Sequence, residues 1–452
     1  MDAPICDFIS AYCRKRPMRL HMPGHKGTIL TGIEPMDITE IPGADSLYAP
    51  EGIIKRSEEN ASRLFGCPTF YSTEGSSQCI RAMLHMVRMY GGEKTVVAAA
   101  RNVHRSFLTA VAMLDLQVHW LYSKEMDSYL SCQLDMEELE QYLANERPTA
   151  LYITTPDYLG NMMDVGQIAE LCHRYKVLLV VDNAHGAYLR FLNPTMHPIA
   201  LGADLCCDSA HKTLPALTGG AYLHVSESAP LMFKQEAKNA LLMYGSTSPS
   251  YLILQSLDLV NVYLVKGFRY QLKERIRQTD ELKEALRNHG YELAGNEPLK
   301  LTICPKSYGY TGQEIHEMLR LENMYCEYAD PDHLVIMISA DLSEGCLLHL
   351  REVLLDIPRR EPILEKPPEF RRCEVVMSVR EASLKASRTL PTTHTLGMVL
   401  AAPSVGCPPA VPIAICGERI DLPTIRRFEY YGVQWVTAYD DEAVERELLW
   451  KS

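Results

Sequence analysis

Short apolar runs alternate with amphipathic segments along the first half of the chain, and this alternation limits the fold more than any other feature. Candidate strands cover residues 70–72, 95–100, 117–122, 150–154, 177–182, 204–208 and 220–225, and helical periodicity fills 79–90, 106–114, 135–145 and 165–175 between them. Strands that alternate with helices and are apolar throughout build a parallel sheet covered on both faces. The pattern therefore predicts an α/β fold with a mainly parallel sheet in a large domain.

The chain of 452 residues is too long for one ordinary core, so further domains are expected. We place the large domain at residues 31–265, after an N-terminal arm at 1–30. A long helical stretch from about residue 252 to 289, broken near Gly267, leads to a small α/β domain within 266–357. A Pro-rich, charged run at 358–368 marks a boundary, and residues 369–452 are expected to form a C-terminal domain.

The composition excludes several classes of partner. A net charge of −12 disfavours nucleic acid and anionic membranes, and no apolar run approaches the ~20 residues of a membrane span. The 14 cysteines show no metal-binding spacing, which predicts reduced, mostly buried thiols and no bound metal. The first residues lack a signal peptide, so we expect a cytoplasmic protein.

Two strand ends carry side chains suited to covalent chemistry. The strand that ends at Asp208 is followed by Ser209, His211 and Lys212, and a desolvated lysine amine attacks aldehydes to form a Schiff base. Alone, this pattern also fits a solvated surface lysine. Upstream, Asp182 ends another apolar strand. A carboxylate there and a lysine downstream together fit pyridoxal 5'-phosphate (PLP), whose ring nitrogen a carboxylate keeps protonated.

The turn at residues 75–77 offers a phosphate site. Gly75, Ser76 and Ser77 precede a helical segment, and a helix N-terminus presents backbone N–H groups and a positive dipole end to an anion. The alternative is an ordinary serine N-cap. The Gly75 turn, His104, Asp182 and Lys212 all follow predicted strands, and ligands of parallel sheets bind at the carboxyl ends of strands. The four positions are therefore expected to meet.

Several motifs in order resemble the Orn/Lys/Arg decarboxylase family, the fold-type I PLP decarboxylases of basic amino acids. The motifs are His21–Gly27, Asp37–Asp45, Arg101–His104, Asp182–Gly186, Ser209–Leu214 and Ser246–Tyr251, with a C-terminal piece from Pro408 to Glu418. The chain is similar to the short form, because no receiver-like wing domain precedes His21. The resemblance implies decarboxylation of lysine, ornithine or arginine to an amine and CO2, in polyamine metabolism.

The resemblance also implies roles for individual residues. Lys212 would bind PLP as a Schiff base, Asp182 would pair with the pyridine nitrogen, and His104 would stack on the ring. His185 would lie near the imine, where it would position substrate or carry a proton. The phosphate would be held by Ser76, Ser77, Ser209 and His211, and the cofactor-binding set further includes Gly75 and Ala184.

Thr247 would reach the phosphate of a neighbouring subunit, which implies a homodimer or a larger assembly of dimers. The alternative reading of residues 244–251 is a plain Ser/Thr loop that caps the next helix at Ser250.

Four places depart from the family pattern: Glu74 replaces a more usual asparagine, Asn183 an acid or serine, Thr218–Gly220 a more polar stretch, and Cys416 a proline. Two other function classes stay open. An aminotransferase or aldolase would share the fold, and Arg380 or Arg388 would be the carboxylate clamp of an aminotransferase. A non-catalytic PLP-binding regulatory protein would not need the set of Lys212, Asp182 and His104.

Overall fold

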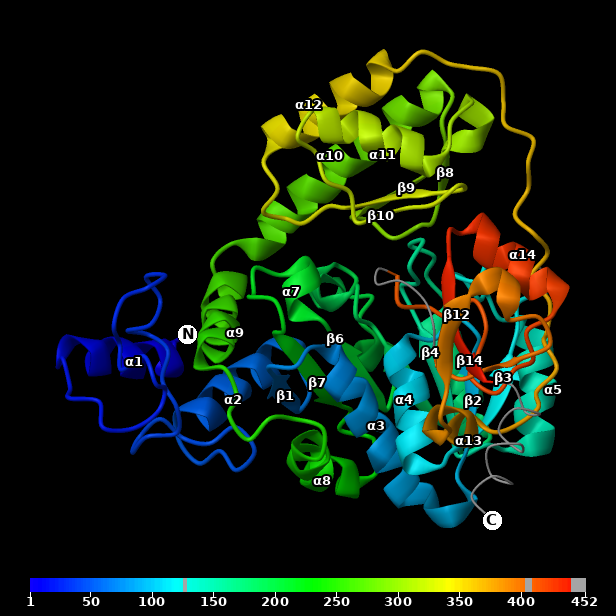
Figure 1. The fold of residues 1–452 in the computed structure, drawn as a ribbon. Coiled ribbons are helices and arrows are strands. Elements are labelled where there is room, and N and C mark those ends of the chain that lie inside the picture. Colours follow the sequence, from blue (N-terminus) through cyan, green and yellow to red (C-terminus); the bar gives the residue numbers. More distant parts are fainter. Residues whose placement is uncertain (125–127, 403–408, 440–452) are drawn as a thin grey trace.

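The computed structural model describes residues 1–124, 128–402 and 409–439, and its centre is a seven-stranded sheet in the order β1-β7-β6-β5-β4-β2-β3 (Figure 1). The strands are β1 (Thr69–Ser72), β2 (Val96–Ala100), β3 (Gln117–Leu121), β4 (Ala150–Thr154), β5 (Leu178–Asp182), β6 (Leu205–Asp208) and β7 (Ala221–Val225). Every residue of β5 and β6 is buried, as their uninterrupted apolar sequences require.

The sheet is parallel from β6 through β3, which confirms the predicted α/β class. The strand β7 is an exception within this mainly parallel sheet, because it runs antiparallel to both β6 and β1. The physical reason is the connection: only one helical turn, α7 (Ala210–Thr213), lies between β6 and β7. Parallel neighbours need a crossover long enough to return the chain to the same edge of the sheet, usually a helix.

Helices cover both faces of the sheet, and the predicted segments are confirmed to within a few residues. One face packs against α3 (Ser76–Gly91), α4 (Arg105–Leu114) and α8 (Leu231–Leu242), and the other against α5 (Met136–Glu146) and α6 (Val165–Arg174). Asp135 and Asp164 cap α5 and α6 by accepting hydrogen bonds from backbone N–H groups of the first turn. The helix α2 (Ile53–Phe65) precedes β1.

The long helical stretch divides into α9 (Tyr251–Val265) and α10 (Phe268–His289). The break lies at Gly267, as predicted, where a φ of 87° suits glycine. After α10 comes an antiparallel sheet in the order β10-β11-β9-β8, made of β8 (Glu292–Ala294), β9 (Lys300–Cys304), β10 (Tyr328–Ala329) and β11 (Leu334–Met337). Two helices, α11 (Gly312–Leu321) and α12 (Glu344–Asp356), complete this small domain. The strands β8 and β10 were not predicted, because three and two residues are too short for a periodic signal.

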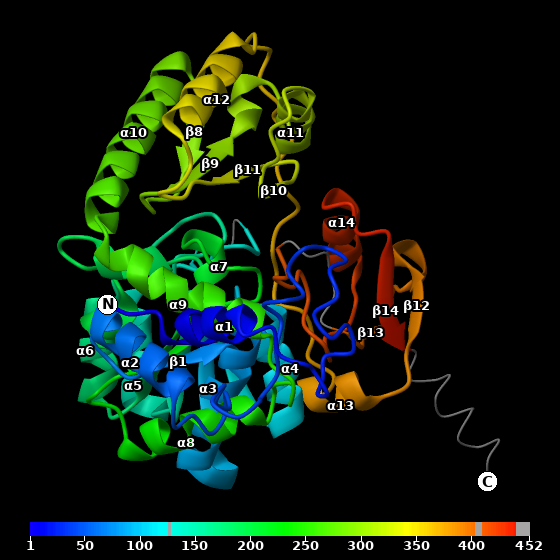
Figure 2. The same cartoon turned by 90° about the vertical axis from the view of Figure 1, so that its left-hand side faces the viewer.

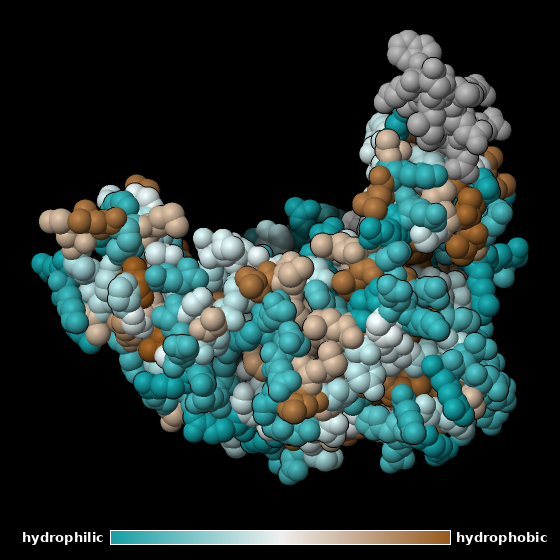
Figure 3. All heavy atoms as spheres, turned by 90° about the horizontal axis from the view of Figure 1, so that it is seen from below, coloured by the Kyte–Doolittle hydropathy of each residue, from teal (hydrophilic) through white to brown (hydrophobic). Residues whose placement is uncertain are grey.

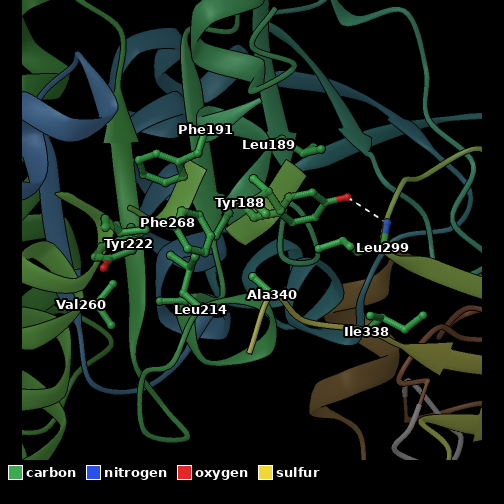
Figure 4. Close-up of a cluster of buried hydrophobic side chains, with 14 of the residues drawn as sticks. Tyr188, Leu189, Phe191, Leu214, Tyr222, Val260, Phe268, Leu299, Ile338 and Ala340 are labelled. Atoms are coloured by element: carbon green, nitrogen blue, oxygen red, sulfur yellow. Dashed lines mark hydrogen bonds between the residues drawn. The ribbon is translucent and has the colours of Figure 1, made fainter. Parts of the chain in front are cut away.

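One hydrophobic core joins the large and small domains. Figure 4 shows Tyr188 and Phe191, which follow β5, packed near Phe268 of α10 and near Leu299 and Ile338 of the small domain. The Leu299 N–H donates a hydrogen bond to the Tyr188 hydroxyl at 3.4 Å. The end of β5 and the start of β9 are therefore held together.

The two ends of the described chain differ in character. The N-terminus forms α1 (Pro4–Arg14), and residues 15–52 contain no helix or strand. The C-terminal part contains α13 (Val379–Leu384), β12 (Arg388–Pro391), β13 (Val399–Leu400), α14 (Leu422–Tyr430) and β14 (Trp435–Tyr439), with a sheet in the order β12-β14-β13. Figure 2 shows the small domain above the large sheet and the C-terminal part beside it.

The three sheets fall inside the three predicted domain ranges, and the division at those limits stays a prediction. Pro408 of the C-terminal motif lies outside the described residues. Within the described chain, none of the helices combines the length and the apolar character that crossing a bilayer demands.

Candidate active site

A cavity of about 280 Å³ opens at the carboxyl ends of β2, β4 and β5. It receives side chains from all three parts of the chain. The large domain supplies Ser76, Asn102, His104, Thr154, Tyr158, Asp182, Ala184, His185 and Lys212, the small domain supplies Glu327, and the C-terminal part supplies Pro409, Ala410 and Val411. Two larger cavities, of about 680 and 630 Å³, contain none of these residues.

Lys212 reaches the cavity from the single turn α7, directly after β6. Its Nζ lies 2.8 Å from Nε2 of His185. The turn ends at Thr213, and the chain leaves it in an extended conformation at Leu214, directly before Pro215. This short turn directs Lys212 back over the strand ends instead of continuing along a helix.

Asp182 ends β5 and is 1% exposed. It accepts hydrogen bonds from the Tyr152 hydroxyl at 3.2 Å and from the Ala184 N–H at 3.1 Å. Burial raises the pKa of Asp182, and the positive charge of Lys212 acts in the opposite direction. A cationic partner at this carboxylate would favour its ionised form.

A buried cluster behind the cavity explains the unusual Asn183. The Asn183 amide donates a 2.7 Å hydrogen bond to Asp208, which also accepts hydrogen bonds from His197 and His224 at 3.1 and 3.0 Å. An acid at position 183 would place a second negative charge against Asp208. The amide instead ties the end of β5 to the end of β6, from which Asp182 and Lys212 emerge.

Both histidines of the cavity are held neutral. His104 caps α4 and accepts the Ser106 N–H at Nδ1, at 3.2 Å, and burial with the nearby Lys212 charge lowers its pKa to about 3. Burial, Lys212 and Lys300 likewise hold the pKa of His185 well below its ordinary value. Neutral imidazoles can stack on a ring and can both donate and accept a proton.

The turn before α3 has the features of an anion site. The helix N-cap is Gly75, at a φ of 71°, and it makes no side-chain cap, so the alternative of an ordinary serine N-cap is wrong. The Ser209 hydroxyl donates to the Ser76 hydroxyl at 2.8 Å, which brings the two predicted serines together. Ser77 lies half-buried beside them in the first turn.

His211 and the 218–220 segment close the same turn. His211 donates from Nδ1 to the carbonyl oxygen of Gly220 at 2.9 Å, and the Gly75 N–H donates to the carbonyl oxygen of Gly219 at 2.8 Å. A Cβ at Gly219 would lie 2.9 Å from the carbonyl oxygen of Thr73. Glycine at this position therefore allows the two loops to approach.

Of the predicted site residues that do not line the cavity, Gly75, Ser77, Ser209 and His211 belong to the turn beside it, whereas Thr247 lies in a different loop. It is exposed, in a loop whose Ser246 N–H donates to Glu74 Oε1 at 3.3 Å. Glu74 thus bonds to this loop. Ser250 caps α9 through the Ile253 N–H, as the alternative reading of the loop expects.

Cys416, which departs from the family pattern, and the two arginines considered as carboxylate clamps also lie away from the candidate site. Cys416 is buried and lines the cavity of about 680 Å³ instead. Arg380 donates to the carbonyl oxygen of Ala112 at 2.7 Å, and Arg388 lies on β12, so neither lines the candidate site.

Motif reasoning missed two residues at the site. Glu327, just before β10, is the only carboxylate besides Asp182 among the described lining residues, and it accepts a 2.9 Å hydrogen bond from Tyr158. Lys300 opens β9 and lies 2.7 Å from His185 Nδ1. A charged lysine at the start of an apolar strand was the only local signal for Lys300, and no spacing connects Glu327 to the other motifs.

The donors in this cavity fit PLP. An amine, a carboxylate and a neutral imidazole surround one space, and serine hydroxyls with an uncapped helix N-terminus lie at its side. The buried Asn102 amide has no hydrogen-bond partner among the described residues, and neither has the Thr154 hydroxyl, although both line the cavity. Buried polar groups of this kind require a ligand or water.

Comparison with known proteins agrees with this fit. The model of the family "Orn/Lys/Arg decarboxylase, major domain" matches residues 3–302. An arginine decarboxylase of Bacillus subtilis strain 168 is 28% identical over 93% of this chain and 91% of its own length, and one of Halalkalibacterium halodurans is 29% identical over 93% and 91%.

Among solved structures, lysine decarboxylase A from Pseudomonas aeruginosa superimposes with a TM-score of 0.78 at 18% identity, over 95% of this chain and 75% of that one. At this identity the likeness supports the fold alone, which is PLP-dependent fold type I. The chain belongs to the Orn/Lys/Arg decarboxylase family of PLP-dependent amino-acid decarboxylases.

Proposed function

We propose that this protein decarboxylates arginine to the corresponding amine and CO2. The observation that carries the proposal is one cavity lined by Lys212, Asp182 and His104 and also by the carboxylate of Glu327. The first three residues fit the cofactor of the family, and the fourth fits a substrate with a positive side chain. The named arginine decarboxylases with full-length similarity support arginine, and lysine and ornithine are the alternatives that the experiment below separates.

Each residue near the cofactor then has a defined task. PLP, bound through its aldehyde to a lysine amine, supplies a protonated ring that accepts the electrons left by departing CO2. Lys212 supplies the amine, and Asp182 maintains the positive charge of the ring nitrogen. His104 packs on the ring, and Ser76, Ser77, Ser209 and His211 bind the phosphate.

His185 is the best-placed group to deliver a proton to the substrate carbon, because it lies against Lys212.

Glu327 is proposed to bind the distal cation of the substrate. Its hydrogen bond from Tyr158 fixes one carboxylate oxygen, which leaves the other for the ligand. A guanidinium group is planar, so it can bond to a carboxylate and lie against an aromatic ring at once. The Tyr158 ring lines the same cavity and offers that surface.

We infer that the working unit is a homodimer with composite sites. The N-terminal arm exposes Met18, Leu20, Met22, Ile29 and Leu30, each at least 62% exposed in the single chain. Figure 3 shows hydrophobic side chains on the lobe that projects at the left, the side on which Figure 1 draws the N-terminal segment. Apolar side chains gathered in this way are typical of an interface between subunits. The exposed Thr247 would then approach the phosphate of the partner.

Subunit mixing tests the composite site. Lys212→Ala and Thr247→Ala subunits are each expected to be impaired, and mixed dimers should regain one site free of both changes. If activity stays at the level of the parents although subunits exchange, each site is built within one chain.

We also infer that the protein works in the cytoplasm, in polyamine metabolism. All cysteines in the described part of the chain are free thiols, which suits a reducing compartment.

The decisive experiment incubates the PLP-loaded protein separately with arginine, lysine and ornithine, and measures CO2 and the product amine. We expect equal amounts of both products from arginine and none with Lys212→Ala. Borohydride should fix PLP to Lys212. Amino-group exchange without CO2, or an adduct on another lysine, would contradict the proposed function.

A further inference from the structure

A short segment of the C-terminal part, residues 409–413, forms one wall of the candidate active site and has no role in the chemistry above. Three of its residues line the cavity, namely Pro409, Ala410 and Val411. They are buried, and Val411 is 6% exposed. Among the other described lining residues, only Pro156 and Ala184 are aliphatic. Most of the aliphatic surface of the cavity therefore comes from the C-terminal part.

Arg101 of the large domain holds this segment in place. It follows β2 directly and is 4% exposed, and its guanidinium group donates to the carbonyl oxygens of Pro412 at 3.0 Å and Ile413 at 3.2 Å. The guanidinium carbon also lies 5.3 Å from the ring centre of Phe370. A planar fork of donors can bond to two acceptors at once, whereas an ammonium group is a compact point charge.

A second contact fixes the segment next to His104. The Arg105 N–H, which opens α4 directly after the N-cap His104, donates to the carbonyl oxygen of Ala410 at 2.8 Å. The first N–H groups of a helix have no partner within the helix, and this carbonyl oxygen satisfies one of them. Ala410 has a φ of 55°, which residues other than glycine rarely adopt unless surrounding contacts maintain it. The wall thus has a fixed position beside the residues that fit the cofactor.

The aliphatic wall suits the middle of a basic amino acid. Such a substrate has a reacting end, a chain of methylene groups and a distal cation. Under the proposed function, Lys212 and its neighbours act on the reacting end, and Glu327 binds the cation. The methylene groups still need a partner, and their burial against aliphatic side chains is favourable. Val411 has the largest aliphatic side chain among the lining residues of the wall.

We propose that Val411 is a specificity-determining residue that contacts the methylene chain of the substrate, and that Arg101 is a positioning residue that holds Val411 there. The inference rests on the proposed function. A wall of fixed position favours one chain length over others, so the C-terminal part helps to select among basic amino acids. Arg101 takes no part in the reaction and acts through the 409–413 segment alone.

Two substitutions of Val411 test the contact with the substrate. The full-length, PLP-loaded protein is assayed with arginine and with homoarginine, which is one methylene group longer. Val411→Ala removes two methyl groups and should raise the ratio of kcat/KM for homoarginine to that for arginine by about tenfold, the lower end of the effect of one methylene group in an apolar pocket. Val411→Ile adds a methyl group and should lower the same ratio. Unchanged ratios in both variants, in protein that still forms CO2, would overturn the proposal.

Arg101→Lys tests the positioning role, because it keeps the charge and loses the fork of donors. Amide hydrogen exchange in peptides that contain residues 410–413 should become faster by about tenfold or more, the factor expected for one lost hydrogen bond to a charged group. The substrate ratio should rise as it does in Val411→Ala. Arg426→Gln is the matched control, because Arg426 lies exposed on α14 in the same part of the chain, and it should alter neither quantity. Faster exchange with an unchanged substrate ratio would show that Arg101 only anchors the C-terminal part, and would refute its effect on specificity.

The Val411 variants keep the proposal testable if Arg101→Lys fails to fold. If lysine or ornithine is the substrate, the same ratio is measured for that amino acid and its homologue one methylene group longer. The proposed function fails independently, through an adduct on another lysine or the absence of CO2.

Discussion

Replacing Glu327 by glutamine should reduce the preference for a positively charged substrate and leave the chemistry at Lys212 unchanged. Glutamine keeps the shape of the side chain and can still accept the hydrogen bond of 2.9 Å from the Tyr158 hydroxyl. Only the negative charge is lost.

The magnitude follows from the partly buried position of Glu327 in the cavity. Two opposite charges about 4 Å apart at an effective dielectric constant of about 20 attract by about 4 kcal/mol, before desolvation is subtracted. Measured net values for hydrogen bonds to charged groups are about 1.5–3 kcal/mol. Glu327→Gln should therefore lower kcat/KM for arginine by about 10- to 100-fold, chiefly through KM.

The assay compares arginine with citrulline, which has a neutral group of nearly the same shape. The wild type should discriminate strongly between them, and Glu327→Gln should reduce the ratio of their kcat/KM values by the same 10- to 100-fold, roughly. Glu322→Gln, an exposed change in the same segment, should alter neither value. An unchanged ratio in Glu327→Gln would refute the assignment of the cation site.

Three further perturbations test other parts of the site. Asp182→Asn should retain PLP but lower kcat by about 100-fold or more with little change in KM, because the amide cannot match the carboxylate charge. A near-normal kcat would contradict the role of Asp182 at the ring nitrogen. Asp208→Asn should reduce the free energy of unfolding by about 3–5 kcal/mol, seen as a lower Tm, since it removes the charge between two buried histidines. Burial opposes ionisation of Asp208, but His197 and His224 outweigh it and hold its pKa below the ordinary value. The difference in Tm between the wild type and Asp208→Asn should therefore be full at pH 7 and should narrow as the pH falls below about 4. A difference in Tm that does not depend on pH would count against this cluster. Gly75→Ala and Gly92→Ala both place a side chain at positive φ, at 71° and 64°, in a region that is nearly restricted to glycine, and each should cost about 1–3 kcal/mol of stability. Only Gly75→Ala should weaken PLP binding, and equal PLP affinities in the two variants would argue against a phosphate at the start of α3.

The strands and helices of the large domain were predictable because each has a local cause. The β5 and β6 sequences are apolar at every position before their terminal aspartates, and burial on both faces of a parallel sheet requires such runs. The direction of β7 was not predictable from its own sequence. It depends on the short α7 connection, whose length becomes clear only when the ends of β6 and β7 are known.

The residues of the candidate site also divide into those that the sequence could predict and those that it could not. Asp182, His104 and Lys212 each lie at or just after the carboxyl end of a strand of one sheet, so their meeting at one edge is a consequence of topology that the sequence already contains. Lys300 and Glu327 come from a second sheet, and their approach depends on how that sheet packs on the loop between β4 and α6. Bonds across this contact, such as Thr302 Oγ1 to the Leu159 carbonyl oxygen at 2.8 Å, have no counterpart in local sequence patterns.

Cofactor chemistry and substrate choice would depend on different domains. Under the proposed function, the large domain carries the groups that act on the cofactor, whereas the small domain carries the carboxylate for the substrate side chain. Substitutions around Glu327 can then alter which amino acid is accepted without displacing Lys212 or Asp182, because the two sets lie on different sheets. Lys300 is the exception, since its ammonium group contacts His185 directly. A small-domain substitution that moves β9 should therefore also displace His185, and one confined to the segment before β10 should affect substrate choice alone.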